Sequence, residues 1–310
     1  MEGPTLVLGY GPCGRATVEA LHRVGRNVIV AQRNRPAALP AGMTFKACDL
    51  TDAAAVRQTV AGMAQVVLAI GLPYDRRVWR ESWPAIMTNV LDACATAGAR
   101  LVFIDGLYML GPQRAPLRED MPLSDHGAKP AVRSAVTRLW MAAAERGRVK
   151  VADLRPSDFY GPGVTNSHLG SMSLQALALG KPAMLIAPPD TLHDFAYVPD
   201  IARATLTLLD APDADFNQIW NMPCAPTRTP RQILDLGAAA LGRRAKIRTI
   251  PLSLLPLLGL GSPMMREISE MRFLFDRPYS VDASKWTRRF WSDVTPFEVG
   301  VPATIRSFAL

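Results

Sequence analysis

The stretch TLVLGYGPCGRATVEAL, residues 5–21, decides the fold, because a short apolar run ends there in a glycine-rich turn that leads into a helix-like pattern. Gly9, Gly11 and Gly14 have the spacing GxGxxG. In a strand-turn-helix unit, the first glycine permits the tight turn, the second lets the backbone approach a pyrophosphate, and the third lets the helix pack closely on the strand. The stretch therefore favours a dinucleotide site over a turn needed only for packing. The cofactor-binding residues predicted in this turn are Gly9, Tyr10, Gly11, Pro12, Cys13 and Gly14.

Length and hydropathy indicate a folded chain that is not a membrane protein. The 310 residues are 49% hydrophobic, enough for a large core. The longest apolar stretch, residues 251–261, is shorter than the roughly 20 residues that a membrane span requires and contains two prolines. We expect it to form a buried element or the wall of an apolar pocket. The N-terminus lacks the pattern of a secretory signal, so we expect a cytoplasmic protein with no membrane partner.

Charge and cysteine usage narrow the class of ligand. The net charge is +8, and residues 1–150 hold 19 Lys and Arg against 12 Asp and Glu. The sequence contains no run of five basic residues, so we expect no nucleic-acid partner and attribute the excess charge to a phosphorylated small molecule. The four cysteines are scattered without metal-ligand spacing, which predicts reduced thiols and no metal.

Hydrophobic periodicity predicts short strands that alternate with helices. This order is typical of the α/β class with a doubly wound parallel sheet of the Rossmann type and a smaller C-terminal substrate lobe. The strands are predicted at 5–9, 27–31, 43–48, 65–70, 100–105 and 149–154. The helices are predicted at 13–25, 52–62, 79–98, 130–146, 170–180, 199–210, 229–242 and 264–275. We assign residues 1–156 and 194–222 to an NADP-binding domain, and residues 157–193 and 223–310 to the substrate lobe.

The end of the second predicted strand bears on the choice of cofactor. An NAD site is expected to place a carboxylate there for the ribose hydroxyls, whereas this chain has Arg33 and Arg35 and no acid between 31 and 35. Two guanidinium groups can pair with a 2′-phosphate, so the sequence favours NADP over NAD. Asp49 either meets the adenine or caps a helix. Leu50, Ile70 and Gly71 follow the third and fourth strands and are also assigned to the cofactor site.

Several further stretches carry a family resemblance. Asp49-Leu50, LRPSDFYGPGV at 154–164 and HDFAYVPDIARA at 193–204 accompany the glycine turn. With them the chain resembles extended short-chain dehydrogenases/reductases of the NAD-dependent epimerase/dehydratase type. That resemblance implies a Ser or Thr after the fifth strand and a Tyr-x-x-x-Lys on the next helix. Here the serine position falls on Gly106, the tyrosine position on Lys129 and the lysine position on Arg133.

The altered triad leaves two interpretations open. In the first, the chemistry is reassigned: Lys129, in the first turn of a helix, protonates a carbonyl oxygen, and Arg133, one turn later, grips the ribose or a substrate anion. Tyr108 is a second proton-donor candidate, and Asp105 orients either group. The alternative for these two residues is that Lys129 is a solvated capping residue and Tyr108 a core aromatic. In the second interpretation, the protein binds NADP without turnover, as a sensor or scaffold. We favour an enzyme.

The substrate lobe carries the remaining candidates. By resemblance, Asp158 lies where the family often has an Asn that contacts the substrate, and Pro156 shapes the same loop beside the cofactor. The other predicted substrate-binding residues are Tyr74, Tyr160, Asn166 and His193.

Two substrate classes remain in competition. Basic residues at 228, 231, 243, 244 and 248 suit the diphosphate of a nucleotide sugar, as in an epimerase/dehydratase, but the apolar 251–261 stretch favours a small carbonyl or activated-alkene substrate. We therefore expect an NADP(H)-dependent oxidoreductase acting on such a small molecule. The sequence leaves a homodimer open.

Overall fold

The computed structural model describes residues 3–37, 39–40 and 42–308, and the chain forms two compact units. The first unit contains the chain up to Met109 together with Leu123–Arg155 and Ile201–Trp220. The second unit contains Leu110–Pro122, Pro156–Asp200 and Asn221–Leu310. Relative to the boundaries predicted from sequence, residues 110–122 and 194–200 cluster with the second unit.

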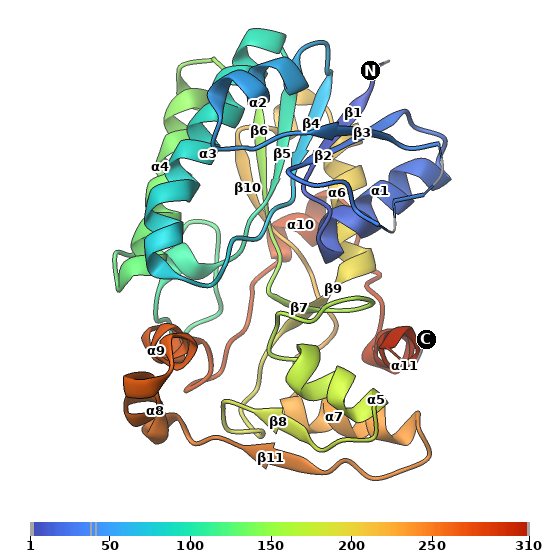
Figure 1. The fold of residues 1–310 in the computed structure, drawn as a ribbon, viewed down its shortest axis with the longest axis vertical. Coiled ribbons are helices and arrows are strands. Elements are labelled where there is room, and N and C mark those ends of the chain that lie inside the picture. The colour runs from blue at the N-terminus through green and yellow to red at the C-terminus, as the bar shows by residue number, and fades with distance from the viewer. Residues whose placement is uncertain (1–2, 38, 41, 309–310) are drawn as a thin grey trace. The chain divides into compact units, whose positions relative to one another are not determined.

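The first unit is built on a seven-stranded sheet with the order β10-β6-β5-β4-β1-β2-β3 (Figure 1). The five pairings from β6 to β3 are all parallel. The strand order reverses between β1 and β4, which is the switch point where doubly wound sheets bind their ligands. The strands are β1 Thr5–Leu8, β2 Val28–Gln32, β3 Thr44–Ala47, β4 Gln65–Leu68, β5 Arg100–Ile104, β6 Val151–Arg155 and β10 Gln218–Asn221.

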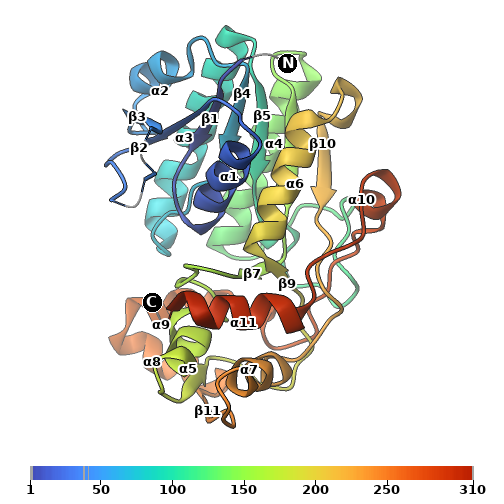
Figure 2. The same cartoon turned by 90° about the vertical axis from the view of Figure 1, so that its right-hand side faces the viewer.

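Helices cover both faces of this sheet. In Figures 1 and 2, α2, α3 and α4 lie on one face and α1 and α6 on the other. The helices are α1 Pro12–Arg23, α2 Ala53–Val60, α3 Arg76–Ala97, α4 Ala128–Glu145 and α6 Val198–Asp210. This confirms the predicted Rossmann-type α/β class; the predicted strands and helices fall within a few residues of the observed ones, and β10 is a seventh strand that the periodicity did not predict.

Local sequence explains where these elements begin and end. All four residues of β1 and of β4 are buried, because both faces of a parallel sheet are covered, whereas β3 at the edge has no fully buried residue. Asp52 and Asp75 cap α2 and α3 by accepting hydrogen bonds from backbone N–H groups of the first turn. Helix α3 ends at Gly98, whose φ of 66° is a left-handed conformation that glycine adopts without strain.

A buried ion pair joins the end of β5 to the first turns of α4. The Arg133 guanidinium pairs with the Asp105 carboxylate, and their side chains are only 4% and 0% exposed. The guanidinium carbon also lies 4.1 Å from the ring centre of Trp83 and 5.1 Å from that of Phe103. A buried charge is tolerated only when it is paired, so this contact fixes α4 against the sheet.

The second unit consists of two small parallel ribbons and surrounding helices. Its strands are β7 Asp158–Tyr160, β8 Ala183–Leu185, β9 Phe195–Tyr197 and β11 Ile247–Thr249, paired as β7 with β9 and β8 with β11. Its α-helices are α5 Ala176–Ala178, α7 Pro230–Ala239, α8 Leu255–Gly261, α9 Pro263–Glu270, α10 Ser284–Arg289 and α11 Phe297–Phe308. A π-helical turn, η2 Gly170–Gln175, leads into α5, so the helix predicted at 170–180 is largely not α-helical.

The prediction for the apolar 251–261 stretch is wrong. It forms the 3-10 turn η4 Leu252–Leu254 followed by α8, and only Leu255 and Gly259 of α8 are buried. Leu257 and Leu260 are 66% and 79% exposed. Hydropathy counts apolar side chains but does not tell whether any surface of the fold covers them, and here none of the described residues does.

We expect Asp105→Asn to destabilise the first unit, because it leaves the buried Arg133 guanidinium without a carboxylate. The free energy of unfolding should fall by about 3–5 kcal/mol in urea denaturation. Asp125→Asn is the matched control, since Asp125 forms an exposed pair with Arg138 at 3.5 Å and should change stability by less than about 1 kcal/mol. Equal effects of the two substitutions would contradict a structural role for the buried pair.

Candidate cofactor site and proton-transfer site

The glycine turn lies at the switch point, between β1 and α1. Gly9 has φ +100°, and a Cβ on it would lie 2.6 Å from the carbonyl oxygen of Ala69. A Cβ on Gly14 would lie 2.2 Å from the carbonyl oxygen of Gly9, so this glycine is required for α1 to meet the strand. A Cβ on Gly11 would meet nothing within 4 Å. The turn is therefore tight on two sides and open at Gly11, where a ligand can approach the backbone.

The start of α1 offers N–H groups to an anion. Pro12 occupies its first turn, and among the described residues no side chain caps the N-terminus. Burial raises the pKa of the Cys13 thiol to about 12, so Cys13 stays a thiol and is not a nucleophile. The Tyr10 hydroxyl is buried and finds no hydrogen-bond partner within the described part of the chain.

Gln32, the last residue of β2, holds the glycine turn in place. Its side-chain oxygen accepts a hydrogen bond from the Tyr10 backbone N–H at 3.0 Å, and its amide nitrogen donates to the Asn34 carbonyl at 2.8 Å. Gln32 stands at the strand end where a ribose-binding carboxylate would be expected. The sequence showed that a carboxylate is missing here but did not predict the role of Gln32. Its position at the end of the strand could have indicated that role.

The two arginines after β2 are exposed. The Arg35 guanidinium carbon lies 5.7 Å from the ring centre of Phe45, and Arg33 is near enough to Asp49 to help lower the pKa of that carboxyl. The main cause of that lowered pKa is the hydrogen bond from the Thr51 backbone N–H to Asp49. Asp49 thus orders a turn before α2, while Asp52 caps that helix.

Of the other predicted cofactor residues of the first unit, Ile70 is the one shown in contact with the turn among the described residues. A Cβ on Gly9 would lie 2.8 Å from a methyl carbon of Ile70, so Ile70 packs on the glycine turn. Leu50 is buried in the core and Gly71 is exposed. Pro156 belongs to the second unit.

Lys129 is buried at the start of α4. It is 0% exposed, and its Nζ lies 4.4 Å from the ring centre of Tyr74. This excludes the interpretation of Lys129 as a solvated capping residue. Lys129 also helps to lower the pKa of the Asp75 carboxyl, after the larger effect of the Arg77 backbone N–H. The positive charge is thus accommodated by an aromatic face and a nearby carboxylate.

The Tyr74 ring that faces this lysine belongs to a set of aromatic rings in contact with one another. The Trp79 ring centre lies 5.8 Å from that of Tyr74 and 5.7 Å from that of Tyr108, and both contacts are edge-on. Tyr108 begins the short 3-10 turn η1 Tyr108–Leu110 just after β5 and is half-buried. Asp75 and Trp79 were not among the predicted site residues; Trp79 only marked the start of the helix predicted at 79–98.

Arg133 and Asp105 are locked together rather than open to solvent. Besides its pair with Arg133, one Asp105 oxygen accepts the Gly106 backbone N–H at 2.7 Å. Burial lowers the pKa of Arg133 to about 9, and the Asp153 charge opposes that effect. The Arg133 Nε and the second Asp105 oxygen are buried without a hydrogen-bond partner among the described residues.

The predicted substrate residues of the second unit gather partly around one pair. His193 Nε2 lies 3.0 Å from an Asp158 oxygen, and the His193 ring packs 4.5 Å from Phe195 and 4.6 Å from Tyr279. Burial, reinforced by His193, lowers the pKa of His168 to about 4. Of the other candidates, Tyr160 is buried in the core between Tyr197 and Phe297, and Asn166 is exposed. Sequence reasoning missed the stacking of His168 on Phe275, with ring centres 4.7 Å apart.

The described residues contain neither a metal-binding group of side chains nor a membrane-spanning helix. Within them, no three His, Cys, Asp or Glu side chains gather into a set that could hold a metal ion. No helix in the same residues has the length and apolar character to cross a membrane.

Comparison with known proteins gives one family match. The model of the NAD dependent epimerase/dehydratase family matches residues 5–222. A search of curated proteins finds no match to the sequence.

Solved structures resemble the chain along nearly its whole length. WbmH of Bordetella bronchiseptica in complex with NAD+ is 19% identical, with a TM-score of 0.77 and coverage of 99% of this chain and 98% of that chain. UDP-glucose 4-epimerase of Thermus thermophilus, in complex with NAD, is 21% identical with a TM-score of 0.74, and 98% of each chain is covered. UDP-glucuronic acid 4-epimerase of Bacillus cereus, in complex with UDP-glucuronic acid and NAD, is 15% identical with a TM-score of 0.80, again over 98% of each chain. At these identities the likeness establishes the fold.

The low pKa of His168 predicts acid sensitivity of the second unit. Because its folded pKa of about 4 lies below the unfolded value of 6.5, the unfolded chain binds more protons between these values, and stability falls as the pH drops from 6.5 towards 4. The expected slope is at most about 1.4 kcal/mol per pH unit. His168→Phe keeps the ring stacking and removes the titration.

Urea denaturation at pH 7 and pH 4.5 measures this effect. The stability lost between the two pH values should be smaller in His168→Phe than in the natural protein, and unchanged in the control His126→Phe, which alters an exposed histidine. An identical loss in all three proteins would rule out His168 as the source.

Proposed function

Because the chain belongs to the NAD dependent epimerase/dehydratase family, we propose that it is a nicotinamide-dinucleotide-dependent enzyme acting at an alcohol or carbonyl carbon of a nucleotide sugar. Family membership makes it an oxidoreductase-like or epimerase-like enzyme. The observation that carries the proposal is the fully buried Lys129, whose ammonium group is held over Tyr74 at the start of α4. We assign proton transfer to this group.

The glycine turn fits a dinucleotide. The open backbone at Gly11, the uncapped start of α1 and the unpartnered Tyr10 hydroxyl together form a cradle for a pyrophosphate at the switch point. When bound, the dinucleotide supplies or accepts a hydride. The residues that hold it are the glycine turn, with Gln32 fixing the Tyr10 backbone, and Ile70 packed against Gly9.

Lys129 moves the proton that accompanies the hydride. In the reducing direction, Nζ of the ammonium donates a proton to the carbonyl oxygen, and the C=O bond becomes an alcohol C–OH. In the oxidising direction, the neutral amine takes the hydroxyl proton back. The Tyr74 ring face and the Asp75 carboxylate accommodate a positive charge at this position, and we assign proton donation to Lys129.

Arg133 acts through position rather than by direct contact. Its guanidinium is paired with Asp105 and packed on Trp83, so it is not free to turn towards a ligand. Because Lys129 and Arg133 are four residues apart on one face of α4, the pair with Asp105 fixes the register of Lys129 above β5. We therefore assign Arg133 and Asp105 as positioning residues. Tyr108 contributes one of the aromatic rings packed around Trp79.

The exposed 251–261 stretch removes one argument for a small apolar substrate and leaves the nucleotide sugar as the better-supported class. The argument for a small carbonyl or activated-alkene substrate depended on an apolar pocket wall at 251–261, and that stretch is exposed. The nucleotide-sugar alternative keeps its support from the family and from the structural neighbours, which include two UDP-sugar epimerases. Within the second unit, the hydrogen-bonded pair of Asp158 and His193 is the proposed sugar contact.

For the cofactor we propose NADP, on the basis of the end of β2. Gln32 is already bonded to Tyr10 and Asn34, and the residues that follow it present the exposed guanidinium groups of Arg33 and Arg35. The neighbours solved with a cofactor hold NAD, which favours the unphosphorylated form. The exposed arginines thus predict tighter binding of NADP(H), whereas the structural neighbours predict tighter binding of NAD(H).

Calorimetric titration with NADP(H) and NAD(H) distinguishes them. If the arginines bind the 2′-phosphate, the natural protein should bind NADP(H) at least about tenfold more tightly, corresponding to about 1.4 kcal/mol. The double substitution Arg33→Ser and Arg35→Ser should remove this preference without weakening NAD(H), and the control Arg57→Ser on α2 should keep it. Equal affinity, or a preference for NAD(H), refutes the NADP proposal.

Substitution of Lys129 tests the proton-transfer proposal. Lys129→Met should lower turnover by about 10²–10⁴-fold on a panel of UDP-sugars, the usual contribution of a general acid, while dinucleotide affinity stays within about twofold. Lys150→Met, at an exposed lysine of the same unit, is the control. Turnover in Lys129→Met equal to that of the natural protein would show that another group moves the proton.

A further inference from the structure

A compact apolar surface with a basic margin lies on the second unit. Of the eleven large hydrophobic side chains that are exposed in the described residues, five lie between 254 and 264. They come from the end of η4, from α8 and from the start of α9. These five side chains, here called the leucine patch, are Leu254, Leu257, Leu258, Leu260 and Met264.

The patch is a fixed feature of the fold. Gly259 lies against the Arg266 backbone, where an added Cβ would be 3.3 Å from the Arg266 Cα. The Arg266 guanidinium donates to the Gly259 carbonyl from two nitrogens, at 3.3 and 3.1 Å. Leu255 is fully buried on the opposite side of α8. The hairpin of α8 and α9 therefore holds its leucines outwards, against the tendency of apolar side chains to be covered.

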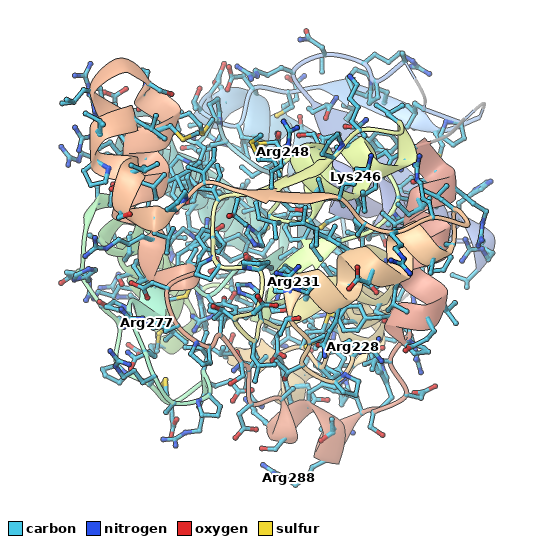
Figure 3. The ribbon with its side chains drawn as sticks, turned by 90° about the horizontal axis from the view of Figure 1, so that it is seen from below. Arg228, Arg231, Lys246, Arg248, Arg277 and Arg288 are labelled. Carbon is cyan, nitrogen blue, oxygen red and sulfur yellow. The ribbon has the colours of Figure 1, made fainter. Side chains whose placement is uncertain are left out.

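The basic margin begins immediately before the patch. From 236 to 266 the sequence contains five basic residues and no acidic one. Arg244, Lys246 and Arg248 are exposed, and within the described part of the chain none of them has a carboxylate partner. Figure 3 shows Lys246 and Arg248 along β11, on the chain that leads into α8.

Three other basic residues of this unit are paired with carboxylates, unlike those of the margin. Arg228 pairs with Glu298 at 2.5 Å, Arg231 with Asp190 at 2.6 Å, and Arg277 with Asp276 at 2.6 Å (Figure 3). Of the carboxylates on α9, Glu267 is buried and Glu270 half-buried. Uncompensated positive charge thus remains beside the leucine patch.

We propose that the leucine patch and its basic margin bind the surface of an anionic phospholipid bilayer. Leucines at the end of a short hairpin can enter the boundary between headgroups and acyl chains, while Lys246 and Arg248 remain at the level of the phosphates. Helix α8 has only seven residues, so the contact is peripheral. This departs from the expectation of no membrane partner and is independent of the proposed catalytic function.

The positive charge of the basic margin argues against a second copy of the chain as the partner that covers the leucine patch. In a two-fold dimer the same patch of both copies is buried, so both basic margins would be brought to one interface. Like charges at the edge of an interface oppose association. An anionic lipid surface complements both the apolar centre and the positive margin.

Sedimentation with large unilamellar vesicles tests the proposal on the full chain. The natural protein should bind vesicles of phosphatidylcholine with phosphatidylglycerol, bind pure phosphatidylcholine far more weakly, and be released as the salt concentration rises. Leu257→Ser with Leu260→Ser should lower the partition coefficient by about 100-fold. Lys246→Gln with Arg248→Gln should lower it by roughly 10- to 30-fold.

Matched control variants distinguish a role of the leucine patch from the general effect of removing an exposed leucine or two positive charges. Leu179→Ser removes a leucine that is 56% exposed elsewhere in the second unit, and Arg23→Gln with Arg57→Gln removes the same total charge from exposed sites in the first unit. Both should bind vesicles as the natural protein does. Circular dichroism of each variant checks that it is folded.

Three outcomes overturn the proposal. The first is failure of the natural protein to bind anionic vesicles, and the second is equal loss of binding in the controls and the patch variants. The third is a dimer, measured by light scattering, that Leu257→Ser with Leu260→Ser dissociates while vesicle binding is absent; this would identify the patch as an interface between copies.

Discussion

The buried ion pair of Asp105 and Arg133 is the interaction on which the first unit depends. A guanidinium and a carboxylate removed from water are costly unless they meet each other, and here each side chain is almost fully buried. The pair joins the residue that follows β5 to the second turn of α4, and Trp83 of α3 covers it. Helix α4 can therefore take only one register against the sheet, and that register sets the position of Lys129.

The same constraint bears on the proposed exchange of tyrosine for lysine as the proton donor. A lysine carries a positive charge where a tyrosine is neutral, so this exchange adds a charge to the position. The added charge must be accommodated, and in this chain Tyr74 provides an aromatic face at 4.4 Å while Asp75 provides a carboxylate. Tyr74 and the Trp79 ring in contact with it thus belong to the proposed site as much as the lysine does.

Features set by neighbouring residues were predictable from the sequence. The GxGxxG turn, the alternation of strands and helices, and the placement of Lys129 in a first helical turn depend on local patterns, and the structure has all of them. Features that need a distant partner were not predictable. Gln32 bonds to Tyr10 across 22 residues, and Lys129 meets Tyr74 across 55 positions of sequence (129 − 74). A local pattern gives the face on which a side chain lies but not the group that it meets.

The exposed leucines also show that a local sequence pattern does not predict which groups a side chain meets in the fold. Residues 251–261 are apolar enough to predict burial, yet burial requires a surface that only the complete fold can supply. The informative departures in a folded protein are a buried charge and an exposed apolar cluster, because each costs free energy unless something compensates for it. In the first unit the compensation for Lys129 and Arg133 lies within the fold, in carboxylates and aromatic rings. In the second unit the described residues supply none for the leucine patch, and the proposed lipid surface would supply it, with a negative charge that suits Lys246 and Arg248.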